Sequence, residues 1–180
     1  MKFMTGDYWC VNSKSFMTAP IIAMEKRMSL DHAAEYNHAG ILVKPPADPE
    51  KDWGTTYEAL RTIGHFHLRQ YEGCKIIIAR HTGMTPEKFQ KGYKEVLRWN
   101  NYAYPAWRLL LYSIGLAKYL HGIGIPICSE LVAEHCFHSD LSVADGYGWT
   151  PDALADKFKQ YRCYDVVFEG ELTKENLFFL

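Results

Sequence analysis

The chain has 180 residues and a formal net charge of −1, and 48% of its residues are hydrophobic and 23% charged. This length fits a single domain over residues 1–180, and this hydrophobic content excludes an intrinsically disordered chain. Because 20 basic residues are balanced by 21 acidic ones, the chain lacks the positive excess with which nucleic-acid binding proteins meet phosphates, and we expect no nucleic-acid partner.

Strand patterns dominate the first half of the chain. The predicted strands are Gly6–Val11, His38–Val43, Trp53–Ala59 and Cys74–Ala79. The last of these is a continuous apolar run, which predicts a central strand of the sheet. Ala19–Leu30 predicts a helix between the first two strands, and the proline-rich segment Pro45–Asp52 predicts a loop after the second.

Helix signals dominate the second half. Thr85–Glu87 supplies a cap residue, a proline and an acid, the usual start of a helix, and Thr150–Asp152 repeats this signature. Further helices are predicted over Pro105–Tyr119 and from Pro126 onward, and Tyr164–Phe168 predicts a closing strand. This succession of strands and helices predicts a mixed α+β domain.

The sequence also carries signals about the compartment. No segment approaches the roughly 18 consecutive apolar residues that a membrane span needs, and Met1–Asp7 lacks the apolar region of a secretory signal. The 5 cysteines are odd in number and no two lie two residues apart, which disfavours a disulfide framework or a four-cysteine zinc site. We expect a cytoplasmic protein with no integral membrane segment, and the sequence leaves the oligomeric state open.

Cys128 is the cysteine whose position best suits nucleophilic catalysis. It follows Pro126 by two residues, at the predicted start of a helix, where free N–H groups and the helix dipole favour an anion. Such a setting lowers a thiol pKa from ~8.5 to roughly 3.5–7.5 when a cation is also near. The same N–H groups can stabilise an oxyanion. The alternative interpretation of Cys128 is an inert buried thiol.

Cysteine catalysis also needs an imidazole and a polar group that orients it. His38 begins an apolar strand, so we expect its side chain at the rim of the sheet, within hydrogen-bond reach of Cys128. Glu58 lies late in the next strand, where a carboxylate needs solvent or a partner. Adjacent strands would bring Glu58 to Nδ1 of His38 and present Nε2 to the sulfur. A solvent-facing Glu58 and a His38 bonded to backbone stay open as alternatives.

Four short motifs follow one another along the chain: Gly6-Asp7, Tyr36-Asn37-His38-Ala39-Gly40-Ile41, Tyr57-Glu58-Ala59 and Cys128-Ser129-Glu130-Leu131-Val132. Together they resemble the NlpC-type cysteine peptidase superfamily, in its circularly permuted, YiiX-like branch, where histidine precedes cysteine. The resemblance implies a papain-like fold with a central antiparallel sheet packed on helices. It also implies that Cys128 is the nucleophile, His38 the general base and acid, and Glu58 the orienting residue, with Tyr36 lining the substrate groove.

The activity implied by this resemblance is that of a cysteine hydrolase without a cofactor. It would cleave an amide bond, as in a cell-wall peptide, or an ester bond through an acyl-enzyme, and its partners would be peptide, amide or acyl substrates. Two other functions on the same scaffold stay open. One is a lipid acyltransferase or thioesterase, which the apolar segment Ala106–Tyr112 would suit, and the other is a binding module without catalysis.

Metal catalysis is a further alternative. His65 and His67 would share one face of a strand, and His135 and His138 one face of a helix. A catalytic zinc needs three protein ligands and an open position. The spacing of these histidines identifies no third ligand, and the sequence contains no His-Glu-x-x-His motif. We therefore expect no metal.

Overall fold

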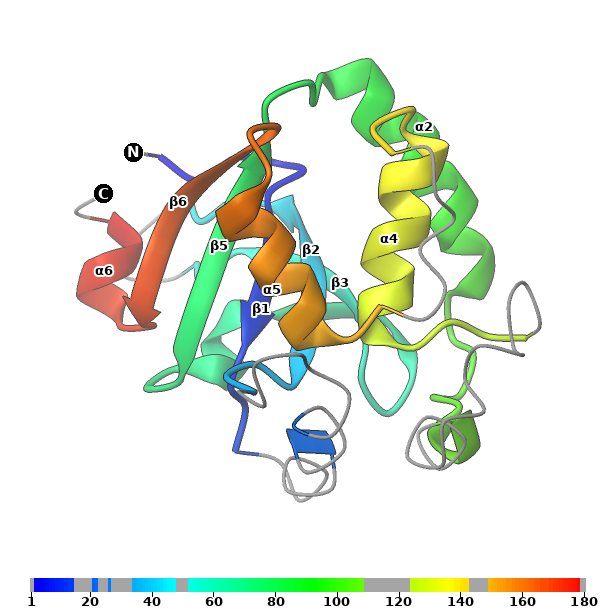
Figure 1. The fold of residues 1–180 in the computed structure, drawn as a ribbon, viewed down its shortest axis with the longest axis horizontal. Coiled ribbons are helices and arrows are strands. Elements are labelled where there is room, and N and C mark those ends of the chain that lie inside the picture. Colours follow the sequence, from blue (N-terminus) through cyan, green and yellow to red (C-terminus); the bar gives the residue numbers. More distant parts are fainter. Residues whose placement is uncertain are drawn as a thin grey trace.

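A six-stranded antiparallel sheet runs through the molecule, with helices packed against it (Figure 1). This computed structural model describes residues 2–14, 21–22, 26, 34–47, 52–108, 124–142 and 149–178. The strands are β1 Tyr8–Val11, β2 His38–Lys44, β3 Thr55–Ala59, β4 Ile63–His67, β5 Lys75–His81 and β6 Tyr164–Glu171, in the spatial order β4-β3-β2-β1-β5-β6. The helices are α2 Pro86–Val96, α4 Cys128–His138, α5 Pro151–Gln160 and α6 Lys174–Phe178, with short 3-10 helices η1 Leu68–Tyr71 and η2 Leu97–Trp99. The α+β class and the antiparallel sheet packed on helices are confirmed.

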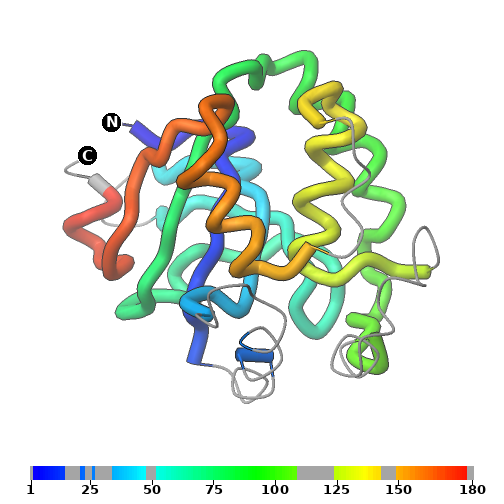
Figure 2. The backbone as a smooth tube through the Cα atoms, in the orientation of Figure 1, coloured from blue at the N-terminus to red at the C-terminus, as the bar shows by residue number. Residues whose placement is uncertain are grey.

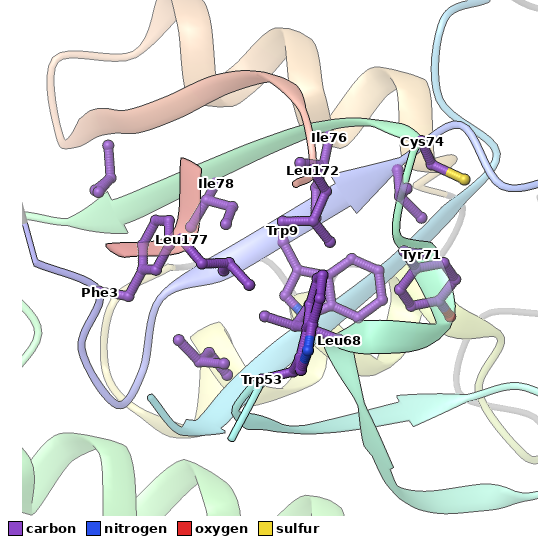
Figure 3. Packing of buried hydrophobic residues seen from close by; sticks show 13 residues of the cluster. Phe3, Trp9, Trp53, Leu68, Tyr71, Cys74, Ile76, Ile78, Leu172 and Leu177 are labelled. Atoms are coloured by element: carbon purple, nitrogen blue, oxygen red, sulfur yellow. The ribbon is translucent and has the colours of Figure 1, made fainter. Parts of the chain in front are cut away.

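Alternate strand positions separate the core into two apolar layers. On β1, Tyr8 and Cys10 face a layer that includes residues of α2, α4 and α5, whereas Trp9 and Val11 face the opposite layer. The second layer is closed by Phe3 and by residues of η1 and α6 (Figure 3). Side chains on both faces of β1 are therefore buried, which explains why its aromatic and apolar residues run without a polar interruption.

The helix starts follow the predicted capping chemistry. The hydroxyl of Thr85 accepts a hydrogen bond from Lys88 N at 3.3 Å, and that of Thr150 accepts one from Ala153 N at 3.2 Å. Each capped helix, α2 and α5, begins with a proline. α2 packs along α4 on one side of the sheet (Figure 2).

Most predicted elements are present, several of them with shifted ends. β3 begins at Thr55 rather than Trp53, because Gly54 has a φ of +80° that no strand residue adopts. β5 lies between β1 and β6, one strand from the edge, and not at the centre. β4 and α6 were not predicted. The predicted helices over residues 19–30 and 105–119 lie mostly outside the described residues.

Two further expectations concern disulfides and membrane segments. None of the five cysteines forms a disulfide. Within the part of the chain that the structure describes, no helix combines the length and the apolar character needed to cross a membrane.

Candidate active site

His38 and Glu58 lie on neighbouring strands and contact each other directly. In the β2–β3 register Gly40 is opposite Glu58, so His38 is a diagonal neighbour on the same face. His38 Nε2 donates to Glu58 Oε2 at 2.6 Å. The expected contact is present, but the predicted ring nitrogen was wrong. Because the two residues are diagonal neighbours, the carboxylate binds Nε2, the ring nitrogen farther from the backbone. Nδ1 is then available to the Cys128 sulfur.

The Glu58 carboxylate is fully buried and accepts four hydrogen bonds. Oε1 accepts from Thr56 Oγ1 at 2.5 Å and from Gln70 Nε2 at 2.9 Å. Oε2 accepts from the Tyr71 hydroxyl as well as from His38. A carboxylate has about four acceptor positions, so burial leaves none of them without a donor. Sequence reasoning missed all three of these additional donors. Only Thr56 could have been predicted from the sequence, because it lies two residues before Glu58 and therefore on the same face of the strand.

Cys128 is the first residue of α4, two residues after the predicted helix start at Pro126, and only 3% of the Cys128 surface is exposed. It packs in an apolar cluster that includes Tyr57 and Ala59 of β3. Burial alone would lower the pKa of His38. The side chains of Cys128 and Glu58, through charge and hydrogen bonding, instead raise that pKa to about 10. This raised pKa favours the protonated form of the imidazole near neutral pH.

A buried ion pair holds the segment that leads into Cys128. Glu130 Oε2 accepts from Ile127 N at 3.0 Å, and its Oε1 accepts from Arg108 Nη2 at 3.0 Å. Arg108 Nη1 also donates to the carbonyl of Ile125 at 2.6 Å. Arg108 is 0% exposed and Glu130 2%. These contacts fix the backbone before the nucleophile, a role that the sequence reasoning did not assign to Glu130.

The segment that leads into His38 is held by α5. Asp152 Oδ1 accepts from the backbone N–H groups of Glu35 at 2.8 Å and Tyr36 at 3.3 Å. Asn37 Oδ1 accepts from Ser13 N at 3.0 Å, which joins the entry of β2 to the end of β1. The first turn of α5 therefore positions the strand that carries His38.

Tyr36 does not have the open position expected of a groove residue. It is 1% exposed, and its hydroxyl donates to Glu169 Oε1 on β6 at 2.8 Å. The ammonium groups of Lys75 and Lys159 each lie 5.6 Å from its ring centroid. These side chains enclose the ring, so its burial does not support the predicted groove contact.

Trp9 of β1 packs over Gly40 of β2, the strand that also carries His38. Gly40 pairs with Trp9 on one side and with Glu58 on the other. The indole of Trp9 is 5.6 Å from the imidazole of His38, between ring centroids, in an edge-on arrangement. A Cβ added at Gly40 would lie 2.4 Å from Trp9 Cζ2, so only glycine leaves room for the indole here.

We expect Gly40→Ala to lower the free energy of unfolding by about 1–3 kcal/mol, because overpacking a rigid core displaces its side chains. Gly64→Ala is the matched control, since Gly64 pairs with Glu58 on the other side and its Cβ would meet nothing closer than 3.7 Å. Urea denaturation followed by circular dichroism measures both variants. Equal midpoints for the two would contradict the close approach of Trp9.

The four histidines considered as metal ligands lie on two elements, His65 and His67 on β4 and His135 and His138 on α4. His65 and His67 are both exposed on β4. His135 is buried and shares a 2.8 Å hydrogen bond with the hydroxyl of Tyr8. Among the described residues, no three His, Cys, Asp or Glu side chains are grouped so that they could hold a metal ion.

The histidine strand precedes the helix that begins at the cysteine, which is the order that the resemblance implies for a circularly permuted papain-like fold. A solved structure of this kind is the crystal structure of the metalloprotein YiiX from Escherichia coli O157:H7. It matches 96% of this chain and 100% of its own with a TM-score of 0.51 and 16% sequence identity. The chain therefore has a YiiX-like fold, as the motifs implied. No family model matches the sequence, and no curated protein matches it.

Proposed function

We propose that the chain is a cysteine hydrolase that cleaves an amide or ester bond through an acyl-enzyme. Cys128 is the nucleophile, His38 carries the proton, and Glu58 orients the imidazole. The observation that supports this most is the buried hydrogen bond from His38 Nε2 to Glu58 Oε2 at 2.6 Å, together with the charge and side-chain hydrogen bond by which Cys128 raises the pKa of the same imidazole. A thiol, an imidazole and an orienting acceptor in contact are the parts that cysteine catalysis needs.

In the first half of the reaction the Cys128 thiolate attacks the carbonyl carbon of the substrate. The C–S bond forms, and the carbonyl electrons move to oxygen, where the N–H groups of the first turn of α4 can stabilise the oxyanion. His38 then gives the proton on Nδ1 to the leaving amine or alcohol as the C–N or C–O bond breaks. The product is a thioester on Cys128.

In the second half His38 takes a proton from water, and the hydroxide attacks the thioester. The C–S bond breaks, the carboxylic acid is released, and the proton restores the imidazolium. Nε2 keeps its hydrogen bond to Glu58 throughout, so the ring stays oriented while Nδ1 exchanges the proton. An alcohol or amine in place of water would make the same site an acyltransferase.

The YiiX structure is described as that of a metalloprotein, and the site residues here do not fit a metal ion. Two ligands of a tetrahedral zinc at 2.0–2.1 Å are about 3.3 Å apart. His38 Nε2 and Glu58 Oε2 are 2.6 Å apart and share a proton. We derive no step through a metal.

Alkylation of Cys128 by iodoacetamide tests the proposal without a known substrate. In the wild type we expect the rate to change little between pH 6 and 8, because His38 holds the sulfur as a thiolate. In His38→Ala we expect a rise of roughly 75-fold over this range, as for a thiol of pKa ~8.5. Peptide mass spectrometry reads each cysteine separately.

Two controls separate activation from access. Cys163, which is partly exposed, is an internal reference for ordinary thiol reactivity in both proteins. His81→Ala removes another buried histidine, 8% exposed against 7% for His38, and should leave the Cys128 profile unchanged. A wild-type Cys128 that titrates like Cys163 would exclude an activated thiolate and favour the binding-module alternative.

A further inference from the structure

A tyrosine shares the carboxylate oxygen that binds His38. The hydroxyl of Tyr71 donates to Glu58 Oε2, and the same oxygen accepts from His38 Nε2 at 2.6 Å. Tyr71 ends η1, shortly after β4, and is 4% exposed. The oxygen therefore lies between two buried donors, only one of which belongs to the three residues assigned to catalysis.

Tyr71 acts toward this oxygen only as a donor. Burial, and then the charge and hydrogen bond of Glu58, raise the pKa of Tyr71 far above its ordinary value. The hydroxyl keeps its proton throughout the pH range in which proteins are folded. A hydrogen bond to a carboxylate is stronger than one between neutral groups, so rotation of the carboxylate away from His38 would break two such bonds at once.

The ring of Tyr71 is itself held in place by its neighbours. Its centroid lies 5.0 Å from that of Trp9 and 5.8 Å from that of His38. Figure 3 shows Tyr71 beside Trp9 in the apolar layer on this face of the sheet. Because Trp9 also contacts the imidazole edge-on at 5.6 Å, the phenol and the imidazole are packed against one aromatic side chain.

We propose that Tyr71 is a positioning residue of this site: it holds Glu58 Oε2 in line with Nε2 of His38 and thereby fixes the direction in which Nδ1 faces Cys128. The hydroxyl of Tyr71 donates to Glu58, so we infer that Tyr71 acts through Glu58. This inference rests on the proposed function and adds a residue that has no place in the four sequence motifs.

Tyr71→Phe keeps the ring and removes the donor. We expect the acid limb of the Cys128 alkylation profile to move up by about one pH unit, since the loss of one hydrogen bond to a charged group is worth about tenfold. We also expect kcat on a model ester to fall by about tenfold with KM unchanged, because Tyr71 is buried and its hydroxyl is bonded to Glu58, so it should affect proton transfer and not substrate binding. The pH profile is a readout that a purely structural role would leave in place.

Tyr57→Phe is the matched control. Tyr57 is buried on β3 beside Glu58 in the sequence, and its hydroxyl donates to the carbonyl of Val96 at 3.1 Å instead of to the carboxylate. It should lose a similar amount of stability without a change of the alkylation profile. If Tyr71→Phe gives the same profile as Tyr57→Phe, Tyr71 is a packing residue and the inference is overturned.

A second variant covers the case in which Tyr71→Phe does not fold. Gln70 is exposed, so Gln70→Ala should fold, and it removes a donor from the other carboxylate oxygen, Oε1. We expect a shift of the acid limb in the same direction but smaller, and no shift would contradict the idea that donors to Glu58 set the His38–Cys128 pair. An ordinary thiol profile in the wild type is a separate outcome, because it overturns the proposed function as well.

Discussion

Cys128→Ala is expected to abolish turnover, with a loss of kcat/KM on the order of 10⁵- to 10⁶-fold, as when the nucleophile of a catalytic triad is removed. The substitution deletes one sulfur from an apolar cluster that retains Tyr57, Ala59 and Leu131, so the melting temperature should change little. A panel of p-nitrophenyl esters and fluorogenic amides supplies the substrate, and the best one is then used for every variant.

The two partners of Cys128 should differ in the size of their effects. His38→Ala removes the group that moves the proton, whereas Glu58→Gln leaves the imidazole present but poorly oriented, so we expect Glu58→Gln to be about 10² times less severe. Cys163→Ala is the control and should retain full activity. Equal turnover in Cys128→Ala, His38→Ala and wild type would refute the catalytic assignment.

The sequence predicts those parts of the fold whose signals are local. Thr85 and Thr150 cap the helices that follow them, and the apolar runs of β1, β2 and β5 have the pattern of buried strands. β4 was missed because a glycine and two exposed histidines interrupt its apolar pattern. What makes it a strand is its antiparallel pairing with β3, together with the hydrogen bonds between Ile63 and residues 101 and 102. Such pairing is not encoded in the composition of the strand itself.

The same limit applies to the candidate site. His38 and Glu58 could be paired from the sequence because His38 begins one predicted strand and Glu58 lies one residue before the end of the next. The donors Gln70 and Tyr71 could not, because they follow the unpredicted strand β4 in a 3-10 helix with no side-chain cap. The choice of ring nitrogen depends on the register, which sets Glu58 opposite Gly40 and not opposite His38. A motif thus identifies the reacting groups, and the strand pairing decides which atoms meet.

Breaking the buried ion pair behind Cys128 is the change with the largest expected effect on stability. Arg108→Met leaves the Glu130 carboxylate, 2% exposed, without the guanidinium that lies 3.0 Å from it. Removing one partner of a buried pair costs about 3–5 kcal/mol, because the remaining charge is not compensated. We expect a loss of this size in urea denaturation. We also expect slower alkylation of Cys128, since Ile125 loses its hydrogen bond from Arg108.

A double variant separates the charge from the packing. In Arg108→Met/Glu130→Gln neither position of the pair carries a charge, and the amide oxygen of glutamine can still accept from Ile127 N, so about 2 kcal/mol or more of the loss should return. Lys91→Met is the control at the surface, because the Lys91–Asp140 pair is 2.6 Å long with side chains 57% and 63% exposed, and its loss should cost at most about 1 kcal/mol. If Arg108→Met costs no more than Lys91→Met, the pair does not hold the segment before Cys128. The N–H groups that the mechanism assigns to the oxyanion would then need another support.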